Sequence, residues 1–238
     1  MIIDKLNADC LFDLIAAKGI DALGSIVQSV LSALCDAKID EFEAQLKENI
    51  VSKRRRFGKG ATLLAPFGYF HPSEIISVVA DNASRGRLLK NGDGCAYIYD
   101  FYSNGEIAAI TSLRNRTKKI CEQVGNVKTY LTYWIGADGS NEIIDVTLAK
   151  YADNGLLDTM IQVALMDNMK KVGEMNVEMN APLTANQRIC RMYTIVPAND
   201  SFKVFGCSPN AYRMFYDDKL KIIDWESLSE EKMTNITL

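Results

Sequence analysis

The first fifty residues carry apolar side chains at intervals of three or four positions. Asn7 and Gly19 bound a short predicted helix as its N-cap and its C-terminal stop. Beyond Asp21 the same spacing continues, which predicts one long helix over about residues 22–51. At 1.5 Å per residue this helix is about 45 Å long, more than a small domain needs to cover its own sheet. We therefore expect it to project, or to pair with another chain through an apolar face formed by Leu23, Val27, Leu31, Ile39, Phe42 and Leu46.

From residue 88 onward the apolar period changes to the alternation that is typical of strands. Asn-Gly and Asp-Gly steps separate the alternating segments and predict hairpin turns. One such turn, at residues 104–105, pairs Tyr99 with Ile110 and Phe101 with Ala108. Further strands are expected at residues 127–135, 142–151, 188–196, 201–205, 212–215 and 220–225.

Two other segments have helical spacing. One predicted helix covers about residues 156–172, and another begins at His71, where Pro72 suits the first turn. Residues 175–182 fit either an edge strand or a connecting loop.

These elements predict an α+β fold in which N-terminal helices precede a mainly antiparallel meander sheet with one or two packed helices. The helical segment covers residues 1–57 and is followed by an α+β domain over residues 58–238. The sequence does not decide whether that domain is divided near residues 173–187.

Composition narrows the class of protein without identifying it. The 238 residues are 48% hydrophobic and 24% charged, which is enough apolar material for a core and excludes a disordered tail, a fibrous rod or a disulfide-stapled miniprotein. The longest uncharged run, residues 22–35, is shorter than the roughly 20 apolar residues that cross a bilayer. Because the N-terminus also lacks the features of a secretion signal, we expect no membrane span and a location in the cytoplasm or in a particle assembled there.

The six cysteines include no Cys-x-x-Cys pair, so neither a zinc ribbon nor a redox dithiol is supported. Cys10, Cys35 and Cys95 have apolar neighbours in the sequence, where cysteine serves as a small hydrophobic residue. We expect reduced thiols in the core.

The net charge of −3 conceals an uneven distribution of charged residues along the sequence. Residues 1–50 hold nine acids and four bases, whereas residues 51–60 hold five bases and no acid. Such asymmetry suits head-to-tail contact between subunits or a local anion site. A second basic cluster consists of Arg114, Arg116, Lys118 and Lys119, and the candidate anion or nucleic-acid patch consists of Lys53, Arg54, Arg55, Arg56 and Lys59.

Motifs for catalysis are missing from the sequence. His71 is the single histidine, which argues against histidine-based metal sites, and no Walker or dinucleotide-binding spacing follows a predicted strand. We therefore expect no catalytic, cofactor-binding or metal-binding residues and no cofactor.

The favoured hypothesis is a non-catalytic structural or assembly subunit, such as a component of a phage-like particle, that acts by packing against protein partners in a homo- or hetero-oligomer. One alternative is a stoichiometric inhibitor or immunity-type protein that covers a partner's active surface. The other is a nucleic-acid-binding protein that uses the basic run at residues 53–59, because phosphate contacts require only clustered cations.

Overall fold

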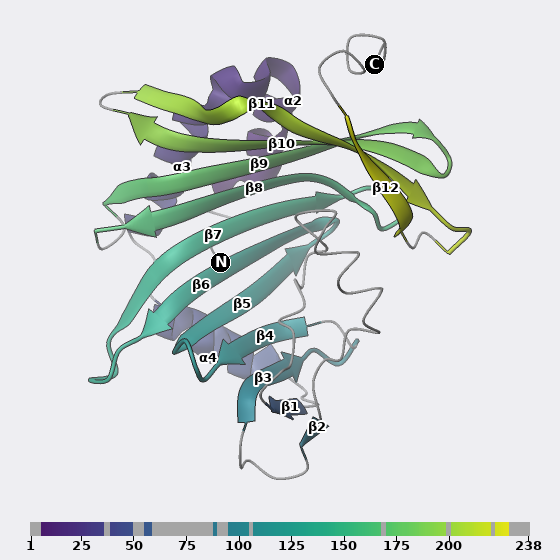
Figure 1. Cartoon of the computed structure of the whole chain (residues 1–238). Helices are drawn as coiled ribbons and strands as arrows, with labels where there is room; N and C mark the ends of the chain where they lie inside the picture. Colours follow the sequence, from purple (N-terminus) through teal and green to yellow (C-terminus); the bar gives the residue numbers. More distant parts are fainter. Residues whose placement is uncertain are drawn as a thin grey trace.

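The computed structural model describes residues 6–35, 39–49, 55–58, 88–89, 95–104, 107–167, 170–198, 201–219 and 222–228. Within these ranges, helices near the N-terminus are followed by one large antiparallel sheet (Figure 1). The α+β class and the antiparallel sheet predicted from the sequence are confirmed. None of the described helices combines the length and the apolar character that crossing a membrane requires.

The helical elements are α2 (Ala8–Lys18), the 3-10 turn η1 (Gly19–Ala22), α3 (Leu23–Cys35) and α4 (Ile39–Asn49). As predicted, α2 ends at Gly19, whose backbone has a positive φ of +55° and whose N–H donates to the carbonyl of Ile15. Asn7 precedes the helix, but its side chain makes no capping hydrogen bond.

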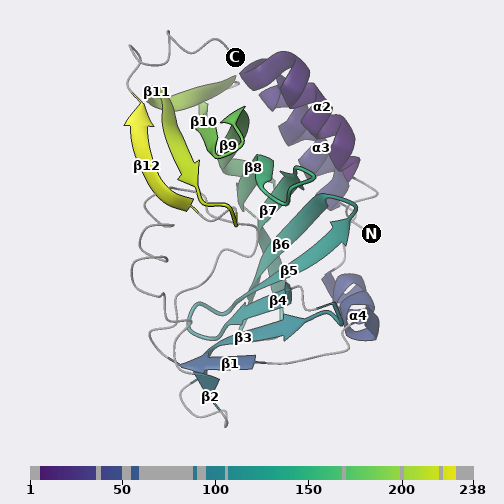
Figure 2. The same ribbon diagram turned by 90° about the vertical axis from the view of Figure 1, so that its right-hand side faces the viewer.

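The single long helix predicted over residues 22–51 is wrong. In its place, α3 lies beside α2 over one part of the sheet, and α4 lies over another part (Figures 1 and 2). The two helices pack on a sheet that twists strongly, and a straight rod cannot keep one face against such a surface over its whole length. The continuous apolar spacing therefore reflects the packing of two helices against the sheet and does not indicate one uninterrupted helix.

The sheet has twelve strands in the order β12-β11-β10-β9-β8-β7-β6-β5-β4-β3-β1-β2, so the chain from β3 onward is a simple meander. The strands are β1 (Arg55–Gly58), β2 (Leu88–Leu89), β3 (Cys95–Phe101), β4 (Ile107–Ser112), β5 (Thr117–Val124), β6 (Val127–Ile135), β7 (Asn141–Tyr151), β8 (Leu157–Met166), β9 (Lys171–Thr184), β10 (Gln187–Ala198), β11 (Ser201–Tyr216) and β12 (Ile222–Leu228).

The helix predicted over residues 156–172 is also wrong, because this segment forms β8 and the start of β9. Ile161 and Val163 face the helices while Met160 faces the other side, and all three are almost fully buried. A strand covered on both faces loses the polar alternation that identifies strands in a sequence. The helix expected to begin at His71 lies outside the described residues.

Residues 175–182, left open as an edge strand or a loop, lie inside β9, which pairs with both β8 and β10. The same sheet therefore continues through residues 173–184. In the β3–β4 hairpin, Tyr99 pairs with Ile110 as predicted, but Phe101 pairs with Ile107 rather than with Ala108. A register shift after Asp100 leaves Ala108 as the extra residue of a bulge.

The core lies between the helices and one face of the curved sheet (Figure 2). Ile26 and Val30 of α3 are fully buried against strand residues such as Val146 and Ile161. Each such side chain contributes roughly 1.5–3 kcal/mol through burial. The opposite face has smaller apolar clusters, one formed by Cys121, Tyr130, Ala149 and Met160, and another by Cys190, Tyr212, Met214 and Tyr216.

Candidate functional site

The predicted interaction helix turns its apolar face inward. Leu23, Val27 and Leu46 are buried, and Leu31, Ile39 and Phe42 are partly buried against the same core. These six side chains pack within the subunit. A partner can therefore contact only the opposite, solvent-facing side of the helices.

That solvent-facing side is acidic. The described helical residues include seven acids and two bases, Lys18 and Lys47. The exposed acids of α2 and η1, Asp9, Asp13 and Asp21, belong to the layer that α2 and α3 form over one part of the sheet, and we call these three residues the acidic face. The other four acids, Asp40, Glu41, Glu43 and Glu48, belong to α4, which is bound to β5 and β6, and all of them except the partly buried Glu43 are exposed.

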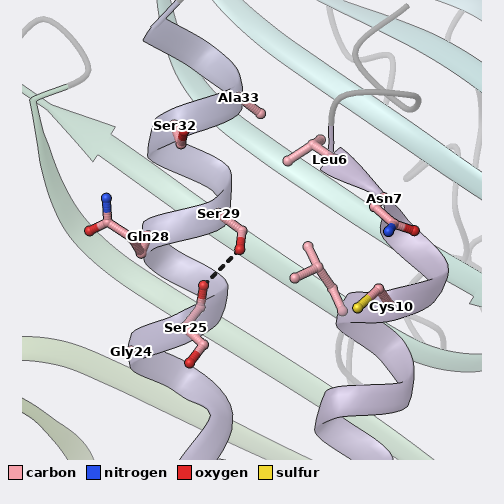
Figure 3. A pocket seen from close by; sticks show the side chains of 10 residues that line it. Leu6, Asn7, Cys10, Gly24, Ser25, Gln28, Ser29, Ser32 and Ala33 are labelled. Carbon is pink, nitrogen blue, oxygen red and sulfur yellow. Dashed lines mark hydrogen bonds between the residues drawn. The ribbon is translucent and has the colours of Figure 1, made fainter.

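A groove of about 960 Å³ runs between α2 and α3 and opens on this side (Figure 3). Small and polar side chains of α3 form one wall, where the Ser29 hydroxyl donates to the carbonyl of Ser25 at 2.9 Å. Leu6, Leu11 and Ala33 also line the groove, although all three are buried. The remaining lining residues of this α2–α3 groove are Asn7, Cys10, Gly24, Gln28 and Ser32.

Cys10, expected in the core, is instead exposed and lines the α2–α3 groove. Its position follows from the helical period, because the buried residues of α2 are Ala8, Leu11, Phe12 and Ile15. Cys121 and Cys190 are buried free thiols, as expected for reduced core cysteines.

Helix α4 is fixed to the sheet through Glu43. Lys118 donates to Glu43 Oε1 at 2.6 Å, and the hydroxyl of Tyr133 donates to the same oxygen. Burial, followed by the hydrogen bond to Glu43, raises the pKa of Tyr133, so the phenol stays protonated. A cavity of about 550 Å³ beside this contact is lined by Asp40, Glu43, Ala44, Tyr133, Ile135, Gly139 and Asn141.

On the opposite face, side chains from β5 to β8 form one buried polar seam around Asp145. Its Oδ1 accepts hydrogen bonds from Thr132 at 3.2 Å and from Thr147 at 3.0 Å, and its Oδ2 accepts one from Gln162 at 2.7 Å. The ammonium of Lys119 lies 4.0 Å from Oδ1. Burial lowers the pKa of Lys119, and the Asp145 carboxylate opposes part of that shift.

The side chains of the second basic cluster therefore do not form one patch. Lys118 and Lys119 are neighbours on β5 and point to opposite faces, where each meets a carboxylate. Arg114 and Arg116 remain exposed in the turn between β4 and β5.

Arg116 contacts Trp134 on the surface of the protein. The backbone of Arg116 is left-handed at φ +52°, its carbonyl accepts a 2.7 Å hydrogen bond from the N–H of Ile135, and its guanidinium lies 5.7 Å from the centroid of the indole ring. Trp134 is 38% exposed and Leu113 is 47% exposed. We call Leu113, Arg114, Arg116 and Trp134 the turn tip.

Sequence reasoning identified the two arginines of the turn tip but missed Trp134. The indole reaches Arg116 because Thr117 pairs with Trp134 between β5 and β6. A tryptophan at the end of a predicted strand was the only signal available in the sequence, and it does not reveal which turn lies beside that end.

Three residues of the basic run, Lys53, Arg54 and Lys59, lie outside the described residues, whereas Arg55 and Arg56 belong to β1. Strand β1 is the second strand from one end of the sheet order, and β11, which contacts α3, is the second from the other end. The acidic α2–α3 layer and the strand that carries the basic run thus lie at opposite ends of the sheet (Figure 2).

In the part of the chain that the structure describes, no group of three or more His, Cys, Asp or Glu side chains is arranged to hold a metal ion. Burial, with Glu178 nearby, raises the pKa of the Cys190 thiol well above its ordinary value, which makes it a poor nucleophile. His71 lies outside the described residues. Comparison of the chain with family models, curated proteins and solved structures finds no match.

Proposed function

We propose that this protein is a non-catalytic assembly subunit whose copies join head to tail, the acidic face of one copy against the basic end of the next. The observation that carries the proposal is the separation of charge along the sheet. Exposed carboxylates such as Asp9 and Asp13 lie on α2, at the end marked by α3 and β11. Arg55 and Arg56 lie on β1, near the other end.

The separation prevents the two charged ends of one copy from neutralising each other, because the sheet extends between them. Complementary surfaces at different places on a subunit form heterologous contacts, which generate rings or open filaments when they repeat. A repeating contact of this kind is what a structural component of a particle requires.

Charge complementarity sets the partner and its orientation more than the affinity. Exposed ion pairs contribute only about 0–1 kcal/mol each. A stable contact therefore also needs apolar burial at the same surface.

The test is sedimentation velocity of the full chain at rising salt concentration. We expect species larger than one chain at low salt, which dissociate as the Debye length falls from about 10 Å at 0.1 M to about 3 Å at 1 M salt. A chain that is monomeric at every salt concentration would contradict the proposal and would favour the inhibitor or immunity-type function, which requires association only with a foreign target.

The nucleic-acid function has its own discriminating measurement. It predicts binding to nucleic acid that weakens with salt and is lost when Arg54, Arg55 and Arg56 are all replaced by Ala. The paired state of Lys118 and Lys119 reduces the cationic surface available for that function.

A further inference from the structure

We infer that the turn tip of one copy docks in the α2–α3 groove of the next copy, with the Trp134 indole as the central contact. This inference rests on the proposed head-to-tail assembly and assigns the apolar contact that exposed ion pairs alone do not supply. It places the two surfaces of the interface on different parts of the subunit, the α2–α3 layer and the turn between β4 and β5.

The turn tip lies in the same row of paired residues as the strand that carries Arg55 and Arg56. Pairing between strands connects Phe57 of β1, Tyr97, Ser112, Thr117 and Trp134 in one row across five neighbouring strands. The row joins the strand that carries Arg55 and Arg56 to the strand that carries Trp134. The turn tip is therefore connected to β1 by continuous strand pairing, although β6 itself is the sixth strand from that end of the sheet.

The turn tip is preorganised for contact. A positive φ is uncommon for a residue such as Arg116, and here the hydrogen bond from Ile135 to its carbonyl holds that conformation. The Asn115 N–H also donates to the Ser112 hydroxyl at 3.3 Å within the turn. A fixed arginine over an exposed tryptophan loses little side-chain freedom on binding, and both residue types dominate binding energy at protein interfaces.

The α2–α3 groove has room and chemistry for an indole. Its volume of about 960 Å³ is kept open by small side chains, and a Cβ built on Gly24 would meet no atom within 4 Å. Leu6 and Leu11 are almost fully buried, so the ring would contact mainly the exposed lining residues, among which the sulfur of Cys10 suits an aromatic ring. Because a buried indole N–H needs an acceptor, the side-chain oxygens of Gln28 and Ser32 complete the match.

Charge supports the same pairing. Asp9 and Asp13 are exposed on α2, one of the two helices that form the groove, whereas Arg116 lies over the indole and Arg114 is exposed in the same turn. Two acids lie beside the turn tip, because Asp138 interacts electrostatically with Arg116 and Glu142 pairs with Trp134 across β6 and β7. This mixture of charges favours a protein partner over a polyanion.

The experiment uses the exposed thiol that already lines the groove. In a Leu113→Cys variant of the full chain, diamide should oxidise the new thiol at position 113 of one copy and Cys10 of the next to a disulfide, itself taking up the two electrons and two protons. The product is a ladder of linked chains on a non-reducing gel, and it should disappear when Cys10→Ser is added. Val124→Cys provides the matched control, because Val124 is 46% exposed and Leu113 is 47% exposed, but Val124 adjoins a turn at the other end of β5.

A second measurement does not depend on disulfide geometry. Trp134→Ala, and separately Ser32→Trp to fill the groove, should each weaken self-association by about tenfold or more, whereas Leu113→Cys before oxidation should change it less. If both variants associate like the parent chain and Leu113→Cys links no better than Val124→Cys, the docking inference is wrong while salt-sensitive assembly still stands. If no association occurs at any salt concentration, both proposals fail. Binding of single-stranded nucleic acid that requires Trp134, without self-association, would also overturn the docking inference.

Discussion

Glu43 Oε1 accepts hydrogen bonds from both the ammonium of Lys118, at 2.6 Å, and the hydroxyl of Tyr133. A single carboxylate oxygen thus joins α4 to two adjacent strands, β5 and β6. Tyr133 is almost fully buried, whereas Glu43 and Lys118 retain 24% and 15% of their side-chain exposure. The ion pair is partly screened by solvent. Most of the free-energy cost of removing the carboxylate therefore comes from the buried phenol, which loses its hydrogen-bond acceptor.

Replacing Glu43 tests this anchor. Glu43→Ala should lower the free energy of unfolding by about 1–3 kcal/mol, because it leaves the buried Tyr133 hydroxyl without its acceptor. Glu43→Gln should cost less, since its amide oxygen can still accept a hydrogen bond. Urea denaturation followed by circular dichroism measures both values. Glu48→Ala on the exposed side of the same helix is the control and should change stability by no more than about 0.5 kcal/mol.

The Asp145 seam yields a second stability prediction. Asp145→Ala removes the acceptor of three hydrogen bonds and the carboxylate nearest to the buried Lys119 ammonium, so the loss should be about 3–5 kcal/mol. Adding Lys119→Met should restore part of that loss, because the double variant no longer buries the charge. Equal stability of the single and double variants would show that Asp145 acts only through its neutral partners.

Lys119 also predicts a dependence on pH. Its pKa is lowered by burial, so between the folded pKa and the ordinary value of 10.5 the unfolded chain binds more protons than the folded chain. The contribution of Lys119 to stability therefore rises as the pH increases through that window. Urea denaturation at several pH values should show this rise in the parent chain and a smaller slope in Lys119→Met. Identical slopes would count against a buried, titrating Lys119.

The raised pKa values of two tyrosines predict that stability falls at higher pH. Burial raises the pKa of Tyr102 and of Tyr216 from 10.0 to about 12. For an acid with a raised folded pKa, the stabilisation is complete below the unfolded value and is lost as the pH rises through the folded value. We expect cooperative unfolding in alkali between about pH 10 and pH 12, with tyrosinate absorbance appearing together with the loss of circular dichroism. Tyrosinate that forms gradually while the sheet persists would contradict this expectation.

Local patterns in the sequence located several elements closely. The bounds of β6 at residues 127–135 and the pairing of Tyr99 with Ile110 were both predicted, because alternation and turn residues are local signals. The helix at residues 156–172 was mistaken because Met160 and Ile161 point to opposite faces and are both fully buried. In such a strand, apolar residues lose the period that separates it from a helix.

The candidate site was harder to predict from the sequence, because its surfaces form through contacts between residues that are far apart in the sequence. The opposite orientations of Lys118 and Lys119 follow from strand periodicity once residues 117–124 are recognised as a strand. The contact between Arg116 and Trp134 instead depends on register across a hairpin. The acidity of the N-terminal segment was visible in the sequence, but the distance between α2 and β1 is a property of strand order.

Charge reversal tests the head-to-tail contact most directly. An acid-reversed variant, Asp9→Lys with Asp13→Lys, and a base-reversed variant, Lys53→Glu with Arg54→Glu and Lys59→Glu, should each be monomeric at low salt, because every contact would then join like charges. Asp153→Lys with Asp218→Lys changes the net charge as much as the acid-reversed variant, at exposed turns of the sheet, and should assemble like the parent chain.

Mixing the two reversed variants tests whether the acidic face of one copy meets the basic run of another. The acid-reversed chain then has two basic surfaces and the base-reversed chain has two acidic ones, so every contact between the two variants joins opposite charges. Sedimentation velocity of the one-to-one mixture should therefore show assembly restored, with the two variants alternating, and a head-to-tail contact allows growth beyond a heterodimer. A mixture that stays monomeric, or a control variant that loses assembly as well, would exclude the acidic face and the basic run as the two halves of one interface.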